Sequence, residues 1–211
     1  IDLAESHEQI TEQNGMIVEV DSSGEIRYQR TDLQSEEIIY NKVIVPRSGE
    51  YFVTLCDGSK VWLNADTEFE FPVNFSETIR EVRLKGEAYF EVAPDSLHPF
   101  IVKTKDMDVM VTGTEFNVNT SSENGVRTVL VEGKVGVTVR GSEREYVLKP
   151  SEMAFYDRGS GKVDVREVDT DLYTLWRKGM FVFERESLES IMETLSAWYD
   201  VEVFFQSESA K

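Results

Sequence analysis

The feature of this sequence that most restricts its fold is a tripeptide that occurs twice in similar surroundings. Thr-Glu-Phe begins at Thr67 and again at Thr114, a spacing of 47 residues. When residues 62–92 are moved by this spacing onto residues 109–139, apolar positions fall mostly on apolar positions. A chance tripeptide would not keep this correspondence over a whole segment. We therefore interpret the two segments as copies of one duplicated unit.

The pattern within each copy is that of consecutive β-strands. Short runs of Val, Phe and Tyr alternate with polar residues and are separated by Gly, Asn and Asp, which is typical of strands joined by turns. The same spacing places Gly86 on Gly133, and we expect both at a tight bend or a positive φ. One copy cannot bury its apolar face alone, so the copies must share a core. The prediction is a mainly β, duplicated, solenoid-like antiparallel body, with a sandwich-like arrangement as the alternative.

Helical spacing first appears near the end of the chain, within residues 186–200. The stripe of apolar positions expected on a helix comprises residues 188, 191, 192, 195, 198 and 199. Ser187 has the side chain of a helix N-cap, and Glu189 lies in the first turn. Apolar runs lie on either side, at 181–183 and 201–205. The sequence therefore predicts a strand–helix–strand unit, which is a partial βαβ domain.

These patterns divide the chain into three regions. We expect N-terminal strands that pack on the β body over 1–39, the duplicated β domain over 40–170, and a truncated α/β domain over 171–211. The chain begins with Ile1 rather than Met, and we interpret it as a fragment of a longer protein.

The charge of the chain excludes two classes of partner. It has 22 Lys and Arg residues against 40 Asp and Glu residues, a net charge of −18 at pH 7. A duplex-binding protein typically neutralises roughly 6–10 phosphates with basic side chains, so nucleic acid is a poor partner, as is an anionic membrane surface. No apolar run is long enough to span a bilayer. We expect contact with a membrane only through a transmembrane helix outside this sequence.

Residues suited to catalysis or metal binding are scarce. The two histidines, His7 and His98, are too few for a typical metal-dependent β-barrel enzyme, and we expect His98 to order the loop before the next strand. The single cysteine, Cys56, has no evident histidine partner, and we interpret it as a small buried apolar side chain. Carboxylate pairs cannot be singled out among 40 acidic residues. We therefore predict no catalytic residue, no metal site, no cofactor and no enzymatic activity.

Several motifs in order resemble those of the FecR family of anti-sigma regulators. They are YNKVIVPRSGEY (40–51), LCDGSKVWLNADTEFEFP (55–72), REVRLKGEAYFEV (80–92), HPFIVKT (98–104), VTGTEFNV (111–118) and TVLVEGKVGV (128–137). The last part, from YTLWRKGMFVF to SAWYDVEVFF, is similar to the start of the C-terminal domain in this family, a secretin and TonB short-like domain. Ser48, Cys56 and Ser59 depart from the family's usual turn residues, and these changes leave the repeat intact.

The resemblance implies a role in signal relay across two membranes. A cytoplasmic anti-sigma segment and one transmembrane helix would precede Ile1, anchoring this region in the inner membrane and placing it in the periplasm. The N-terminal signalling domain of a ligand-loaded, TonB-dependent outer-membrane transporter would bind it, and an extracytoplasmic-function sigma factor would be released through the cytoplasmic segment.

The strand–helix–strand unit is the candidate contact surface, because a half-open sheet can accept a partner strand. The candidate partner-binding residues are Trp198, Tyr199, Val201, Val203 and Phe205. Alternatively, these side chains pack the core of the small domain itself. Two other functions remain open from the residues alone: a carbohydrate-binding or structural β module of an exported protein, and a β-solenoid enzyme acting on polysaccharide.

Overall fold

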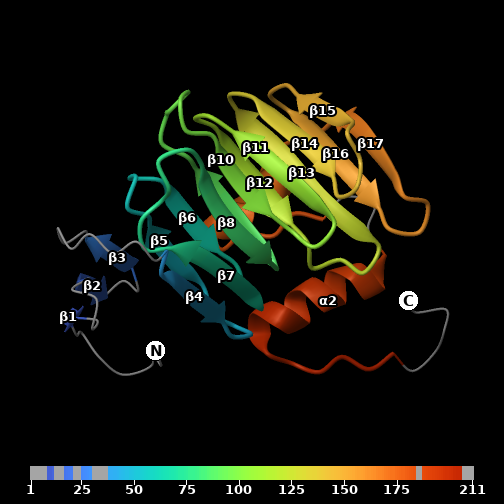
Figure 1. The fold of residues 1–211 in the computed structure, drawn as a ribbon. Helices are drawn as coiled ribbons and strands as arrows, with labels where there is room; N and C mark the ends of the chain where they lie inside the picture. The colour runs from blue at the N-terminus through green and yellow to red at the C-terminus, as the bar shows by residue number, and fades with distance from the viewer. Residues whose placement is uncertain (1–8, 12–16, 21–24, 30–37, 184–186, 206–211) are drawn as a thin grey trace.

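The computed structural model describes residues 9–11, 17–20, 25–29, 38–183 and 187–205, and for the first three segments it describes the backbone alone. Most of the chain forms strands, which Figure 1 labels in chain order. They are β1 (Gln9–Thr11), β2 (Ile17–Val20), β3 (Glu25–Gln29), β4 (Tyr40–Val45), β5 (Tyr51–Thr54), β6 (Lys60–Leu63), β7 (Thr67–Pro72), β8 (Arg80–Lys85), β9 (Glu87–Glu91), β10 (Phe100–Lys103), β11 (Met107–Val111), β12 (Glu115–Asn119), β13 (Gly125–Glu132), β14 (Val135–Val139), β15 (Glu145–Leu148), β16 (Glu152–Asp157) and β17 (Lys162–Glu167).

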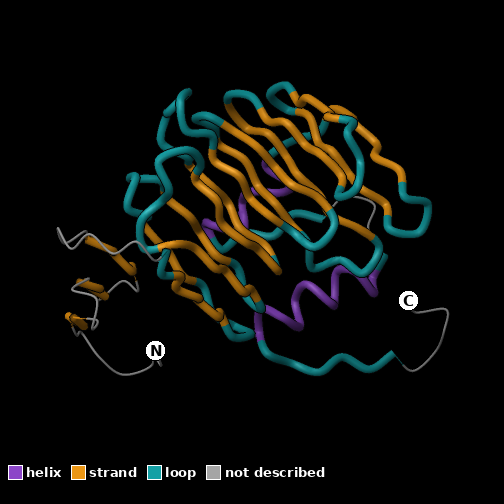
Figure 2. Tube along the Cα trace, viewed as in Figure 1, coloured by secondary structure: helices purple, strands orange, loops and turns teal. Residues whose placement is uncertain are grey.

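The strands form two sheets that pack as layers (Figures 1 and 2). One has ten strands in the order β1-β2-β3-β5-β6-β9-β12-β13-β16-β17, and the other has seven in the order β15-β14-β11-β10-β8-β7-β4. Within the described residues the pairs are antiparallel except β3 with β5 and β8 with β10. The prediction of a mainly β, duplicated body is confirmed in its sandwich-like form. The solenoid-like form is wrong, because each copy divides its strands between the two layers instead of forming one coil.

A layer of aromatic side chains joins the two sheets. Phe90 and Phe116, on neighbouring strands of the ten-stranded sheet, stack with ring centroids 4.9 Å apart. Phe90 also meets Phe69 and Phe100 of the seven-stranded sheet edge to face, at 6.1 and 6.2 Å. All four side chains are fully buried. Each such ring removes roughly 150–250 Å² from water, so this layer contributes much of the free energy that holds the sheets together.

The two proposed copies contain equivalent strands that pair in the same pattern. In residues 62–92, β6 pairs with β9 and β7 with β8, and in residues 109–139, β11 pairs with β14 and β12 with β13. The sheets are exchanged between the copies, because β6 and β9 lie in the ten-stranded sheet while β11 and β14 lie in the other. Gly86 and Gly133 have φ of +114° and +99°, which confirms the prediction for both.

The spacing between the copies is not uniform. Phe69 pairs with Leu84 in the first copy, whereas Phe116 pairs with Leu130, one residue earlier than a spacing of 47 would give. A β-bulge beside Phe116 accommodates the additional residue. Its effect is to keep Leu130 in the core and to turn Val131, the expected equivalent of Leu84, away from it.

The end of the chain is helical and lacks the predicted strands. It forms α1 (Asp171–Thr174), the 3₁₀ turn η1 (Leu175–Lys178) and α2 (Leu188–Tyr199), which Ser187 caps by accepting from Ser190 N as predicted. Residues 181–183 and 201–205 pair with no strand in the described ranges, so the βαβ unit is incomplete. Their apolar pattern suits a strand, but a strand forms only against a neighbour. None of the helices that the structure describes is long and apolar enough to cross a membrane.

The outer face of the seven-stranded sheet carries a charge ladder across three strands. Glu68 of β7 accepts from Lys42 of β4 and Lys85 of β8, each at 2.5 Å. These hydrogen bonds, that of Lys42 first, lower the pKa of Glu68 to about 2. The ionised carboxylate therefore ties the edge strand β4 to the interior of the sheet.

We expect Gly86→Ala to destabilise the fold by at least about 2 kcal/mol, because a side chain is strained at this φ and would also meet its neighbours. A Cβ at this position would lie 2.4 Å from Thr67 Oγ1 and 2.7 Å from Thr67 Cα. Gly141→Ala is the matched control, since Gly141 has φ of +79° but a Cβ added there would have no atom within 4 Å. Urea unfolding of both variants measures the difference, and equal losses would show that strain alone acts at Gly86.

Glu68 gives the fold a pH dependence in the acid range. A carboxyl whose pKa is lower in the folded state stabilises it above the unfolded pKa, here the ordinary value of 4.5. That contribution is lost as pH falls from about 4.5 toward 2. Glu68→Gln should flatten the fall in free energy of unfolding over this range, whereas Glu143→Gln, in the turn after β14, should leave it unchanged. Parallel pH curves for wild type and Glu68→Gln would contradict this assignment.

Candidate functional site

After β17 the chain crosses the outer face of the ten-stranded sheet, and we call residues 170–179 the strap. Trp176, only 6% exposed, donates from Nε1 to Asn117 Oδ1 of β12 at 3.3 Å. Thr174 is buried beside it. The strap thus covers strands in the middle of the sheet, and Figure 1 shows this part of the chain behind the sheets.

Arg177 fixes the strap through an aromatic and ionic contact. Its guanidinium carbon lies 3.3 Å from the ring centroid of Tyr89 and 5.3 Å from that of Trp62, and Nη1 lies 3.7 Å from Glu91 Oε1. The Tyr89 hydroxyl donates to Glu115 Oε2 at 2.8 Å. Burial is the larger cause and this hydrogen bond the second cause of a pKa of Tyr89 well above its ordinary value. The hydroxyl of the ring under Arg177 therefore stays protonated.

Polar side chains beneath the strap form a chain of hydrogen bonds within the sheet. Glu87 Oε1 accepts from Asn117 Nδ2 at 2.9 Å, and Glu87 Oε2 accepts from Asn64 Nδ2 at 2.8 Å. Asn117, 1% exposed, therefore links Glu87 to Trp176. Sequence reasoning missed these residues. The available signal was a buried strand, EFNVN, with an amide at its centre, since a polar group in such a place needs a partner.

The helix α2 is attached to the body at its C-terminal end. Ser48 N, in the β4–β5 turn, donates to the Ala197 carbonyl at 2.8 Å. Arg47 Nη2 donates to Ser196 Oγ at 3.1 Å, and Arg47 Nε lies 3.6 Å from Asp200 Oδ1. A cation at a helix C-terminus is favourable because the last carbonyls carry partial negative charge. The turn in which Ser48 departs from the family pattern is therefore the turn that binds α2.

The structure separates the five predicted partner-binding residues into two groups. Trp198 is partly buried and meets Phe181 edge to face at 4.5 Å, so it packs within the chain. Val203 and Phe205 are also partly buried. Tyr199 and Val201 are exposed, at 65% and 46%. Binding by any of them remains a prediction.

Exposed apolar side chains gather at this end of the chain. Those over residues 180–204 are Met180, Val182, Leu188, Tyr199, Val201 and Phe204. Phe204, which was not among the predicted residues, is 81% exposed, and no residue of α2 is fully buried. Several large apolar side chains left open to solvent within a short stretch of chain suit a protein interface.

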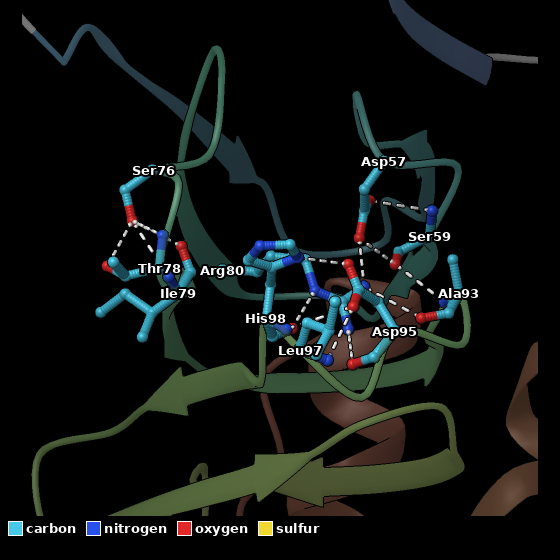
Figure 3. Close-up of polar contacts among 10 residues, drawn as sticks. All are labelled: Asp57, Ser59, Ser76, Thr78, Ile79, Arg80, Ala93, Asp95, Leu97 and His98. Carbon is cyan, nitrogen blue, oxygen red and sulfur yellow. Dashed lines mark hydrogen bonds and ion pairs between the residues drawn. The ribbon is translucent and has the colours of Figure 1, made fainter.

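A second polar centre joins the two sheets at one end of the sandwich, and Figure 3 shows it in close-up. Arg80, at the start of β8, is 3% exposed. Its Nη1 donates to Asp57 Oδ2 at 2.7 Å and to the Ala93 carbonyl at 2.9 Å, and its Nε donates to the His98 carbonyl at 2.8 Å. Asp57 also accepts from Ser59 N and Oγ. Nη2 also donates to the Asp95 carbonyl at 3.5 Å, so Arg80 holds the β5–β6 turn and the β9–β10 loop together.

A similar contact lies beside the second copy, although its arginine is not the expected equivalent of Arg80. Arg158, after β16, donates from Nε to Asp106 Oδ2 at 3.0 Å and from Nη1 to the Glu123 carbonyl at 3.1 Å. Asp106 lies in the β10–β11 turn and Asp57 in the β5–β6 turn. Each hairpin turn thus offers one carboxylate to an arginine that also binds loop carbonyls.

An open hollow of about 590 Å³ lies beside Arg80, and Cys56, Asp95 and His98 are among its lining residues. Cys56 is exposed, so its interpretation as a buried side chain is wrong: a turn position does not face the core. His98 Nδ1 lies 2.7 Å from Asp95 Oδ2, and the same carboxylate accepts from His98 N, which confirms that His98 orders its loop. The hydrogen bond with His98 lowers the pKa of Asp95. Within the described ranges, no group of three or more His, Cys, Asp or Glu residues is arranged to hold a metal ion.

Arg177→Ala should release the strap while leaving the sandwich folded. The lost cation–π contact is worth about 1–2 kcal/mol, so amide exchange over 171–178 should accelerate roughly 5- to 30-fold. Lys178→Ala, an exposed neighbour in the same strap, is the control and should change little. Hydrogen exchange measured by mass spectrometry decides the matter, and equal exchange in both variants would count against an anchoring role for Arg177.

Comparison with known proteins identifies the family. The model for "FecR protein" matches residues 42–136, and the model for "FecR, C-terminal" matches residues 180–211. Two crystal structures of a candidate anti-sigma factor from Parabacteroides distasonis ATCC 8503, at 1.65 and 2.50 Å resolution, are each 33% identical with a TM-score of 0.73. They align with 77% and 78% of this chain and 76% of theirs. No curated protein matches the sequence. The chain therefore belongs to the FecR family of anti-sigma factors.

Proposed function

We propose that this chain is the sensor and relay region of a membrane-bound anti-sigma factor, located in the periplasm and anchored in the inner membrane. The signal comes from the N-terminal signalling domain of a TonB-dependent outer-membrane transporter. The output is control of an extracytoplasmic-function sigma factor, through a cytoplasmic segment joined by one transmembrane helix. Family membership supports the regulatory role. It also supports the location, because FecR proteins are typically membrane-anchored with a periplasmic domain.

The observation that carries the proposal is the set of exposed apolar side chains formed by Met180, Val182, Leu188, Tyr199, Val201 and Phe204. Residues 201–205 have the alternating pattern of a strand but pair with no strand in the described part of the chain. Val201 N donates to the Ser196 carbonyl at 3.2 Å, and a partner strand would pair with the main chain after it. The side chains of Tyr199 and Phe204 would offer aromatic anchors beside that strand. A signalling domain that adds a strand here would cover the apolar side chains that the fold leaves open.

The charge of residues 187–205 indicates what kind of partner surface would be complementary to them. Residues 187–205 include Glu189, Glu193, Asp200 and Glu202 but neither Lys nor Arg. A partner face with basic residues around an apolar centre would therefore be complementary, and electrostatic attraction would raise the association rate at low salt.

The attachments of this segment provide a route for the signal. The Ser48–Ala197 hydrogen bond and the Arg47–Asp200 pair hold the end of α2 that precedes 201–205. A partner that orders 201–205 would act on this end first, and then on the strap through residues 180–183. Binding would cause a conformational change only if the partner has a higher affinity for the form in which α2 is released than for the form in which α2 is attached, or the reverse.

A titration of the chain with the purified signalling domain tests the proposal. We expect binding by isothermal calorimetry, weakened at least about tenfold by Phe204→Asp, because a buried aromatic anchor is worth about 2 kcal/mol or more. Leu97→Asp is the matched control, since Leu97 is also 81% exposed but lies in the β9–β10 loop, and it should bind as wild type does.

The full-length regulator gives the second readout, with a reporter gene under its sigma factor. Phe204→Asp should abolish induction by the transporter ligand, while Leu97→Asp should not. Binding that neither variant alters would place the contact elsewhere. A chain that binds oligosaccharide and no signalling domain would favour the carbohydrate-binding alternative and overturn the proposal.

A further inference from the structure

The last strand of the ten-stranded sheet, β17, has an open edge. It pairs with β16 over six residues without a bulge, and no strand in the described ranges pairs with its other side. Five of its six residues are exposed, including Val165 at 39%. Edge strands are usually protected by Pro, by a bulge or by charged side chains. β17 contains no Pro, but four of its six residues are charged, so a strand added here must match these charges. Figure 1 shows β17 at the far end of the sandwich from β4.

The backbone geometry fixes which residues of β17 face this open edge. Val168 N donates to the Ser151 carbonyl at 2.8 Å, so the main-chain groups of Val168 point toward β16. Because these groups alternate along an antiparallel strand, those of Val163, Val165 and Glu167 point outward. Any strand added here must hydrogen-bond with these three residues.

We propose that the occupant of this edge is β17 of a second copy, paired antiparallel about a two-fold axis at Val165. In this register Val165 faces Val165 of the second copy, and Val163 exchanges main-chain hydrogen bonds with Glu167 of the second copy. Asp164 then lies opposite Arg166 of the second copy, twice by symmetry. These are non-hydrogen-bonded positions, where Cα atoms are roughly 4.5 Å apart and side chains are closest.

The charges select this register over its neighbours. If the second β17 shifts by one residue, main-chain groups that point toward the partner lie opposite groups that point back toward β16, and no ladder of hydrogen bonds forms. With the axis at Asp164, that carboxylate faces the same carboxylate of the second copy, and Lys162 faces Arg166 of the second copy. With the axis at Arg166, the two Arg166 guanidinium groups face each other. Both registers oppose like charges. An axis at Val163 pairs Lys162 with Asp164 but leaves Arg166 and Glu167 outside the ladder. The strand KVDVRE is therefore self-complementary from Val163 to Glu167 in one register.

Burial supports the same arrangement. Val163 packs against the core of the sandwich, and Val165 lies on the same face but is open because the sheet ends there. Pairing of Val165 with its symmetry mate would continue the apolar inner face across the two-fold axis. Asp164 and Arg166 lie on the opposite face with side chains 65% and 62% exposed, 4.0 Å apart, and can reach across the axis. A single strand pair buries little area, so the dimer is a weak one.

Charge exchange at two positions tests the proposal by sedimentation velocity over a range of protein concentrations. Wild type should show a concentration-dependent dimer. Asp164→Arg and Arg166→Asp should each be monomeric, because each places like charges opposite one another. The double variant restores opposite charges and should dimerise as wild type does. An equimolar mixture of the two single variants should form a heterodimer, since each strand then faces its complement.

Circular dichroism and thermal unfolding serve as the folding control, and the exposed positions of Asp164 and Arg166 should leave both unchanged. Restored association in the double variant and in the mixture excludes loss of folding as the cause. A wild type that stays monomeric at every concentration overturns the proposal, as does a dimer that the single variants retain. If the wild type is monomeric and Asp164→Arg abolishes binding of the signalling domain, the edge belongs to that partner and self-pairing is wrong.

Discussion

The structure depends on the burial of one aromatic layer between two sheets. Phe90 and Phe116 from one sheet meet Phe69 and Phe100 from the other, and all four rings are fully buried. The polar centre around Arg80 and the charge ladder on the outer face add directional hydrogen bonds and ion pairs to this apolar packing. They specify which loops and strands lie together, while the apolar layer supplies most of the free energy.

Much of this fold could be predicted from the sequence because its signals are local. Gly86 reveals a bend through backbone sterics alone, and the alternation of apolar residues reveals strands. The arrangement of the copies could not be predicted, because strand pattern is the same whether copies stack in a coil or exchange sheets. The additional residue in β13 was also hidden, since Val131 and Leu130 are both apolar and only the ladder shows which faces inward.

For the same physical reason, the sequence could indicate part of the candidate contact segment, although binding there stays a prediction. Tyr199 and Val201 lie on a segment whose periodicity is visible in sequence, and the structure leaves them exposed. The strap was missed because Trp176 and Asn117 are 59 positions apart in the chain, and no periodicity links such residues. Arg127, the expected equivalent of Arg80, instead lies over Tyr173 of the strap. Duplication therefore predicts where strands recur better than it predicts what their polar side chains contact.

The exchange of sheets between the copies has a consequence for how the molecule comes apart. Each copy contributes one neighbouring pair of strands to each layer. The copies meet where β9 pairs with β12 in one layer, and where β10 lies between β8 and β11 in the other. Phe90 of the first copy stacks on Phe116 of the second across this boundary, so we expect the two halves of the sandwich to stabilise each other and to unfold together. The strap and α2 are held by a few side-chain contacts and by the Ser48–Ala197 hydrogen bond, so we expect them to detach at a lower free energy than the sandwich needs to unfold. The contacts in the described part of the chain thus divide it just after β17 into a closely packed sandwich and an end that is attached through few contacts.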